Sequence, residues 1–182
     1  MIIRQTEVES VLVIEPELLE DDRGFFARIF CTEELAAHGI QFQIAQINAS
    51  YNRQERTIRG LHYQTGVHAE AKLIRCTAGA VFDVVVDMRP ESPTYLRHFG
   101  VVLSAENRLS VYVPRLCAHG YLALSDGAEI LYPVDVPYVA SAERGVRYDD
   151  PVVDIEWPID VRVVSEKDRS WPTIERDRAR GA

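Results

Sequence analysis

The stretch from Lys72 to Asp87, KLIRCTAGAVFDVVVD, decides the fold class of this chain. It contains two short segments rich in Val, Ile, Leu and Phe, residues 72–77 and 80–87. The sequence Thr77-Ala78-Gly79 between them is typical of a turn. Short β-prone segments on either side of a turn predict two strands.

Similar segments recur along the rest of the chain at intervals of about ten residues, separated by turn sequences. The predicted strands are Val11–Ile14, Phe42–Ile47, Thr57–Tyr63, Lys72–Thr77, Ala80–Asp87, His98–Leu103, Leu109–Val113, Gly120–Leu124 and Glu129–Val134. This pattern predicts an all-β sandwich or barrel. One helix is predicted over Glu33–His38, with Thr32 as its cap and Gly39 as its stop. Residues 165–169 read as a second short helix after a loop.

The length of 182 residues predicts one domain, 1–182, in which about residues 170–182 form a charged and frayed tail. No apolar run suits a membrane span, since Asp83 interrupts the longest one. The N-terminus lacks the features of a secretory signal, so a cytoplasmic location is expected. Three widely spaced cysteines, Cys31, Cys76 and Cys117, predict free thiols rather than disulfides or a zinc knuckle.

The chain carries a formal net charge of −8, which argues against nucleic acid as its main partner. Binding to duplex phosphates needs a basic face. A few arginines in a cleft can still bind a small anion such as a diphosphate, because such contacts are local and bidentate. Small anionic molecules therefore remain possible partners.

Chemistry is indicated first by the segment Arg59–Gln64, RGLHYQ, and by Lys72. Removing a proton next to a carbonyl requires a base that titrates near neutrality, a cation for the enolate oxygen and an acid that returns the proton. His62, Lys72 and a tyrosine supply these three groups. A single histidine in an apolar segment is more often a hydrogen-bonded core residue, so His62 alone is weak evidence.

Strand alternation predicts where these side chains point. In a regular strand, His62 lies on one face together with Gly60 and Gln64, whereas Arg59 lies on the other face. Arg59 is then expected to serve a site from a strand end or a dimer contact, or to form a surface ion pair. Lys72 shares a face with Ile74 and Cys76, so it points inward if Ile74 does. A lysine there needs an anion or a developing oxyanion.

Two tyrosines, Tyr132 and Tyr138, flank a proline-containing segment that suits an edge strand running into a binding loop. One can donate a proton and the other can stack on a base, or both can be core aromatics. A metal site is the main competitor, with His62, His68, Glu70 and His119 as ligand types. Their spacing fits poorly, because no H-x-H pair is present.

Several ordered motifs from Val11 to Asp168 resemble the dTDP-4-dehydrorhamnose 3,5-epimerase family. They are Asp21-Asp22-Arg23-Gly24-Phe25-Phe26, Arg59-Gly60-Leu61-His62-Tyr63-Gln64, Ala71-Lys72-Leu73, Asp83-Val84 with Asp87-Met88-Arg89, Ser92-Pro93-Thr94, Leu103-Ser104-Ala105-Glu106-Asn107, Ala118-His119-Gly120, Asp149-Asp150-Pro151, Ile155-Glu156-Trp157-Pro158 and Ser165-Glu166-Lys167-Asp168.

The resemblance implies a cupin-type jelly roll, a homodimer that exchanges strands, no metal or other cofactor, and a nucleotide-diphosphate-linked 4-keto-6-deoxyhexose as substrate. The implied reaction is epimerisation at C3, C5 or both in deoxysugar biosynthesis. By matching position, His62 is the base, Asp168 orients it, Lys72 holds the enolate oxygen and Tyr132 returns the proton from the opposite face. The implied substrate-binding residues are Arg23, Phe26, Gln46, Asn48, Arg59, His119, Tyr138, Glu143 and Lys167.

The chain departs from the family pattern at a few positions. Arg28 stands where the family commonly has Glu, which alters the charge beside the nucleotide pocket. Leu116 and Cys117 stand where Gly-Phe is frequent, and Tyr148 replaces a usual Trp. Two alternatives stay open at this point: a 3,4-ketoisomerase on the same scaffold, and a cupin that binds a metal or a sugar without this catalysis.

Overall fold

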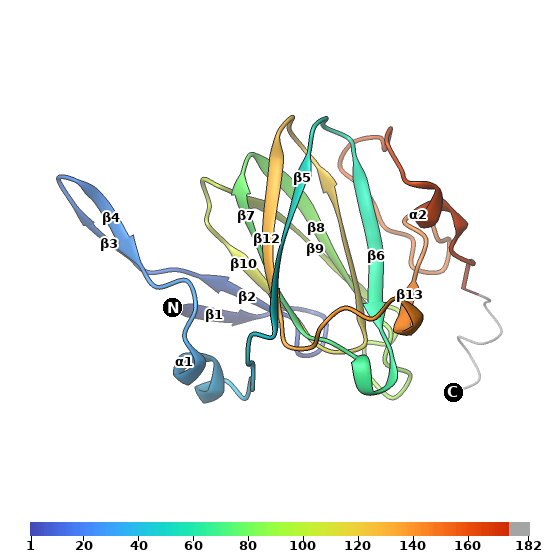
Figure 1. Ribbon diagram of the computed structural model, residues 1–182, viewed down its shortest axis with the longest axis horizontal. Helices are drawn as coiled ribbons and strands as arrows, with labels where there is room; N and C mark the ends of the chain where they lie inside the picture. The colour runs from blue at the N-terminus through green and yellow to red at the C-terminus, as the bar shows by residue number, and fades with distance from the viewer. Residues whose placement is uncertain (175–182) are drawn as a thin grey trace.

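The chain folds as a sandwich of two antiparallel sheets, seen edge-on in the computed structural model, which describes residues 1–174 (Figure 1). The six-stranded sheet contains, in spatial order, β1 (Ile2–Gln5), β2 (Leu12–Glu15), β10 (Ser110–Val113), β7 (Lys72–Ala78), β12 (Ala128–Val134) and β5 (Gln46–Asn52). The five-stranded sheet contains β13 (Glu143–Gly145), β6 (Ile58–Gln64), β11 (Cys117–Ala123), β8 (Ala80–Asp87) and β9 (His98–Ser104). The predicted all-β jelly-roll sandwich is confirmed.

The main core lies between the two sheets. Alternate residues of neighbouring strands point inward, as the pleat requires, so that Ile74 and Cys76 of β7 meet Val81 and Val85 of β8. All four side chains are fully or almost fully buried. The inward direction of the Ile74 face confirms the condition under which Lys72, two residues earlier, points between the sheets.

Both outer faces of the sandwich are partly covered. Helix α1 (Thr32–Ala37) packs Leu35 against Leu12 and Leu73 of the six-stranded sheet. The chain after β13 packs Val146, Val153 and other apolar side chains against the five-stranded sheet. The hairpin of β3 (Leu18–Asp21) and β4 (Gly24–Ala27) projects away from the sandwich (Figure 1).

The C-terminal segment crosses the outer face of the five-stranded sheet and forms one wall of the site. Val163 forms a parallel bridge with Thr57, at the start of β6. Helix α2 (Glu166–Ser170) follows, and the Ser165 hydroxyl caps it by accepting a hydrogen bond from the Asp168 amide at 3.0 Å. The predicted helix at 165–169 is therefore confirmed, and Asp168 faces β6.

Several predicted elements need correction. The strand predicted at Phe42–Ile47 begins only at Gln46, because Phe42 is part of the apolar cluster around α1. Thr32 is the first residue of α1 and not its cap; Cys31 precedes the helix, and no side chain caps it. Gly39 has the expected positive φ of 80°.

Four strands were not predicted, namely β1, β3, β4 and β13. The structure also contains the 3₁₀ turns η1 (Gly66–His68) and η2 (Ala140–Ala142). The three cysteines are free thiols, as expected. Across residues 1–174, no helix has the length and apolar character that a membrane crossing requires. Most of the predicted tail, residues 175–182, lies outside the described part of the chain.

Candidate active site

A bulge in β6 brings Arg59 and His62 onto the same wall. His62 pairs with His119 of β11, and Arg59 pairs with Tyr121, so three steps on β6 match two steps on β11. The extra residue interrupts the alternation of faces. Gly60 adopts a φ of 105°, and a Cβ there would lie 2.7 Å from the backbone of β11. The prediction that Arg59 and His62 lie on opposite faces is therefore wrong.

His62 forms a short hydrogen bond with Asp168 of α2. Its Nε2 lies 2.5 Å from Asp168 Oδ1, and the Gly60 amide donates to Oδ2 at 3.3 Å. Burial alone would raise the pKa of Asp168, but the hydrogen bond and charge of His62 and the donor at Ser165 lower it below its ordinary value. Asp168 is thus a carboxylate that accepts a hydrogen bond from the Nε2–H group of His62, which leaves the lone pair of a neutral imidazole on Nδ1.

Lys72 is buried in the site, with a residue exposure of 7 %. Its ammonium donates to the carbonyl oxygen of His62 at 2.9 Å and lies 3.0 Å from Glu70 Oε1. An ammonium has three N–H donors. One of them is committed to the His62 carbonyl, and the Glu70 carboxylate holds the ammonium by an ion pair, so N–H donors remain for a bound oxygen.

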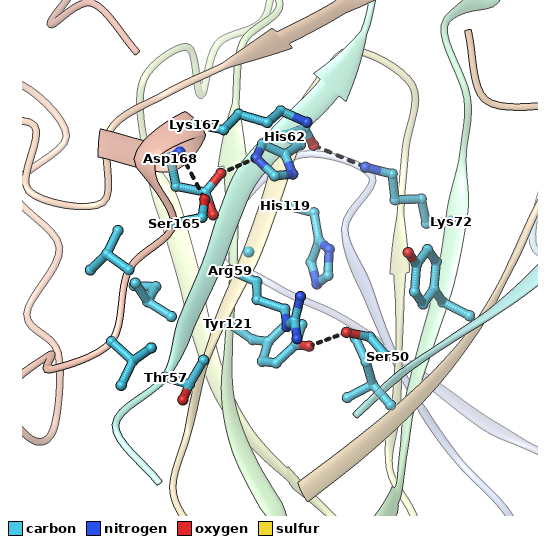
Figure 2. Close-up of a pocket in the computed structure, with 16 residues that line it drawn as sticks. Ser50, Thr57, Arg59, His62, Lys72, His119, Tyr121, Ser165, Lys167 and Asp168 are labelled. Carbon is cyan, nitrogen blue, oxygen red and sulfur yellow. Dashed lines mark hydrogen bonds and ion pairs between the residues drawn. The ribbon is translucent and has the colours of Figure 1, made fainter. Parts of the chain in front are cut away.

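Two adjoining cavities meet at His62, Lys72 and Tyr132. The larger, of about 480 Å³, also contains Arg59, His119, Tyr121, Ser165, Lys167 and Asp168 (Figure 2). The smaller, of about 270 Å³, also contains Gln46, Asn48, Glu70, Tyr138 and Glu143. The three shared residues are the imidazole, ammonium and phenol that the sequence predicted for proton transfer.

Tyr132 comes from β12, in the sheet opposite to His62. Burial, assisted by the nearby Tyr121, raises the pKa of the Tyr132 phenol above its ordinary value. The group is therefore protonated at neutral pH and suited to donate a proton. Because the two sheets face each other across the cavity, the imidazole and the phenol can approach a bound ring from different sides.

A second histidine-carboxylate pair lies deeper in the larger cavity. His119 Nε2 lies 2.7 Å from Asp83 Oδ2, and His119 is only 8 % exposed. Figure 2 shows His119 below His62, with Arg59 next to it. The Arg59 guanidinium donates to Asn52 Oδ1 at 2.9 Å and to the Tyr51 carbonyl at 3.1 Å.

Polar side chains gather around the smaller cavity. The Gln46 amide donates to Asn48 at 2.6 Å. Glu143 accepts a hydrogen bond from the Tyr138 hydroxyl at 3.0 Å and forms an ion pair with Lys167 at 2.6 Å. Glu143 Oε1 also lies 3.8 Å from His62 Nδ1. The ring of Tyr138 is mostly exposed and therefore free to stack on a planar group.

Two of the predicted substrate-binding residues lie elsewhere. Arg23 and Phe26 are on the β3–β4 hairpin and line neither cavity within the one chain. Phe26 is 70 % exposed, and Arg23 pairs with Asp21. Arg28, the position that departs from the family pattern, forms an ion pair with Glu34 at 2.6 Å.

The candidate metal ligands do not gather into one site. Among residues 1–174, no three His, Cys, Asp or Glu side chains form a group suited to a metal ion. His62 and His119 pair with different aspartates, and Glu70 pairs with Lys72. His68 lies in the turn η1.

The part that three residues have in the site was not predicted: Glu70 was considered only as a metal ligand, and Asp83 and Trp171 were given no role. Glu70 lies two residues before Lys72, the spacing at which side chains of an extended segment share a face. Asp83 is a charged residue within an apolar strand, where it needs a partner. Each therefore gave a signal in the sequence. Trp171 gave no such signal. Its indole meets the His62 ring edge to face, with 6.1 Å between the centroids.

Comparison with known proteins gives one consistent result. The family described as dTDP-4-dehydrorhamnose 3,5-epimerase matches residues 5–176. An enzyme of that name from Shigella flexneri is 41% identical over 171 residues, which cover 92% of this chain and 93% of the relative.

Solved structures agree. The Bacillus anthracis dTDP-4-dehydrorhamnose 3,5-epimerase with TDP and PPi bound superposes with a TM-score of 0.91 at 37% identity, covering 94% of this chain and 98% of that one. The epimerase from Legionella pneumophila in complex with dTDP-4-keto-L-rhamnose superposes with a TM-score of 0.88 at 35% identity, covering 96% of this chain and 95% of that one.

Proposed function

The chain belongs to the dTDP-4-dehydrorhamnose 3,5-epimerase family, whose members are isomerases of deoxysugar biosynthesis, and we propose that its His62, Lys72 and Tyr132 invert C3 and C5 of a dTDP-linked 4-keto-6-deoxyhexose. The observation that carries this assignment of roles is that these three residues line both cavities. A sugar ring at the junction would contact all three.

The proposed first step is removal of a ring proton next to the ketone. The free Nδ1 of His62 takes the proton, the electrons of the C–H bond form a carbon–carbon double bond, and the carbonyl oxygen becomes an enolate. Asp168 holds the imidazole through Nε2 and stabilises its charged form. The base is thereby oriented before substrate binds.

The enolate is the costly species, and Lys72 would stabilise it. Its ammonium donates one N–H to the His62 carbonyl and pairs with the Glu70 carboxylate, which leaves N–H donors for the substrate oxygen. A preorganised donor to an oxyanion is worth roughly 3 to 4 kcal/mol in a site that excludes water. Glu70 would act here by positioning the ammonium.

Inversion requires that the proton returns from the other face. The Tyr132 hydroxyl gives its proton to the ring carbon, and the carbonyl re-forms as the double-bond electrons take it. The resulting phenolate and imidazolium exchange with solvent, which restores both groups. The same cycle at the second carbon next to the ketone completes a double epimerisation.

The smaller cavity would receive the nucleotide. Gln46 and Asn48 offer amide donors and acceptors, and Tyr138 offers an aromatic face to a base. Arg59 and His119 lie in the larger cavity and would contact the sugar or diphosphate, with Glu143 and Lys167 as further ligands between the two. A nucleotide-linked sugar suits this division into two adjoining spaces.

The projecting hairpin supports a homodimer of single-domain chains. Leu19, Phe25 and Phe26 are exposed on it, although large apolar side chains are normally covered. We propose that the hairpin packs on a second copy and carries Arg23 and Phe26 to the partner's cavity. The expected cytoplasmic location stays a prediction.

Subunit mixing tests this arrangement. Arg23→Ala and His62→Asn are each expected to be nearly inactive alone. After the two variants are unfolded and refolded together, a mixed dimer holds one site with both wild-type residues, so activity returns. If Arg23 served its own subunit's site, the mixture would stay inactive.

The test of the chemistry is solvent exchange. The enzyme is incubated in D₂O with a dTDP-linked 4-keto-6-deoxyglucose, and deuterium at C3 and C5 is followed by NMR. Incorporation at both carbons with formation of the inverted product is expected. Migration of the ketone to C3 would instead identify a 3,4-ketoisomerase.

A further inference from the structure

We propose that Trp171 and Gly145 are positioning residues for the reaction, because the indole rests on the bare Cα of Gly145 and thereby holds Asp168 against His62. This inference rests on the proposed role of the His62–Asp168 pair. Neither residue lines the cavities, so they would act only through the residues that do.

The helix that carries Asp168 is too short to hold its own place. Helix α2 has five residues, Glu166–Ser170, and an isolated helix of this length is not stable in water. Its side chains reach the body through polar contacts, namely Asp168 with His62 and Lys167 with Glu143. The Lys167 side chain is half-exposed, so its ion pair contributes little, and one buried hydrogen-bonded group does not fix a helix by itself; an apolar anchor is needed.

Trp171 is that anchor. It directly follows α2, and its ring packs edge to face on His62 at an interplanar angle of 64°. No acceptor for its indole N–H is found within residues 1–174, so the contacts that the structure shows for this side chain are packing contacts. Further along, the Ile174 amide donates to Asp150 at 2.7 Å, which fixes the chain beyond the indole.

Gly145 makes room for the indole. It lies on β13 directly opposite His62 of β6, and a Cβ at this position would lie 2.2 to 2.3 Å from three indole atoms. Its φ lies outside the left-handed region, so alanine is acceptable to the backbone and only the space forbids it. A methyl group here must push Trp171 and α2 away from His62.

The experiment is a double-mutant cycle of Gly145→Ala and Trp171→Ala, assayed by deuterium uptake into the dTDP-linked ketosugar. We expect Gly145→Ala to lower kcat by about 10- to 100-fold, as displacement of a catalytic group by about 1 Å can do, with little change in KM. Trp171→Ala should lower kcat similarly, and the double variant should be no worse than Trp171→Ala, because the methyl group then has room. Trp171→Phe, which keeps an aromatic anchor, should retain most of the activity.

Gly100→Ala is the matched control. A Cβ at Gly100 would lie 2.5 Å from the ring of Phe82, so the substitution also crowds an aromatic side chain against a strand, but outside both cavities. It should lower the thermal midpoint and leave kcat unchanged.

Two results would overturn the proposal: a wild-type kcat in Gly145→Ala, whether or not its thermal midpoint falls as in the control, or losses of kcat that multiply in the double variant. Absence of exchange by the wild type would instead remove the proposed function.

Discussion

The site contains two histidine-carboxylate pairs that differ in how the fold builds them. His119 and Asp83 come from neighbouring strands of one sheet, and both are almost fully buried. His62 is on a strand, but its partner Asp168 is 106 positions away on a short helix, and the His62 side chain is 28 % exposed. The first pair is fixed by the sheet, whereas the second is assembled from two separate segments.

This difference indicates different tasks. A pair held within the sheet, away from solvent, suits a hydrogen-bonding group of fixed position for a bound ligand. A pair whose imidazole reaches the junction of the cavities can take a proton and release it to solvent. A histidine and an aspartate therefore serve ligand binding in the His119–Asp83 pair and proton transfer in the His62–Asp168 pair. The surroundings of each pair determine its task.

The largest contrast is expected between the two histidines. His62→Asn should lower kcat for exchange by about 10²- to 10⁴-fold, the usual contribution of a general base. His119→Asn should raise KM more than it lowers kcat. Steady-state kinetics on the two variants measures this, and a larger loss of kcat in His119→Asn would reverse the assignment.

The two aspartates sharpen the comparison. Asp168→Asn removes the charge that stabilises the imidazolium, and a loss of kcat of about 100-fold is expected, at the low end of the general-base contribution. Asp83→Asn keeps a polar group against His119, so kcat should fall much less. Comparable kcat losses in both variants would show that the two pairs do the same work.

Substitutions of Glu70 test whether this residue serves catalysis by orienting the Lys72 ammonium or by its negative charge. Glu70→Leu removes the carboxylate that pairs with the ammonium at 3.0 Å. It should lower kcat by about tenfold, which is less than the roughly 10²- to 10³-fold loss when an oxyanion donor itself is deleted. Glu70→Gln keeps an acceptor and should stay close to wild type. An equally severe loss in Glu70→Gln would assign the effect to charge.

Another buried carboxylate, Asp87, lies outside both cavities and should affect only stability. Although burial opposes ionisation, hydrogen bonds from Arg89, Ser92 and Thr94 lower its pKa to about 2. Because this value lies below the unfolded-state value near 3.8, Asp87 stabilises the fold fully above about pH 4, and about 2 kcal/mol is lost as pH falls toward 2.

Denaturant unfolding between pH 7 and 2 measures this loss, and it should be absent from Asp87→Asn. The turnover of that variant at pH 7 should equal that of the wild type. A fall in kcat with the fold intact would connect Asp87 to the site.

Local sequence signals were enough for most strands of the two sheets but not for the bulge. The segment 72–87 was predicted almost to the residue, because apolar content and the turn at Gly79 both act locally. The relation of Arg59 to His62 depends on pairing with β11, and that partner is not visible in β6 itself. The projecting hairpin was missed because its residues are not buried within the one chain.

In the site, too, local features were predicted and long-range contacts were not. His62 and Lys72 were found from the chemistry of single residues in apolar segments. The role of Asp168 followed only from the family resemblance, since no local pattern joins residues 106 positions apart. The contact of Trp171 with Gly145 could not be predicted, because it depends on where the C-terminal segment crosses the sheet.

The central claim is that His62 removes a proton on one face of the sugar ring and Tyr132 returns one on the other. The most direct measurement compares deuterium in recovered substrate and in product for the wild type, His62→Asn and Tyr132→Phe in D₂O. Tyr132→Phe should still exchange deuterium into recovered substrate through His62 while forming almost no inverted product, and His62→Asn should do neither. Inverted product from Tyr132→Phe at the wild-type rate, or exchange by His62→Asn at that rate, would contradict the account.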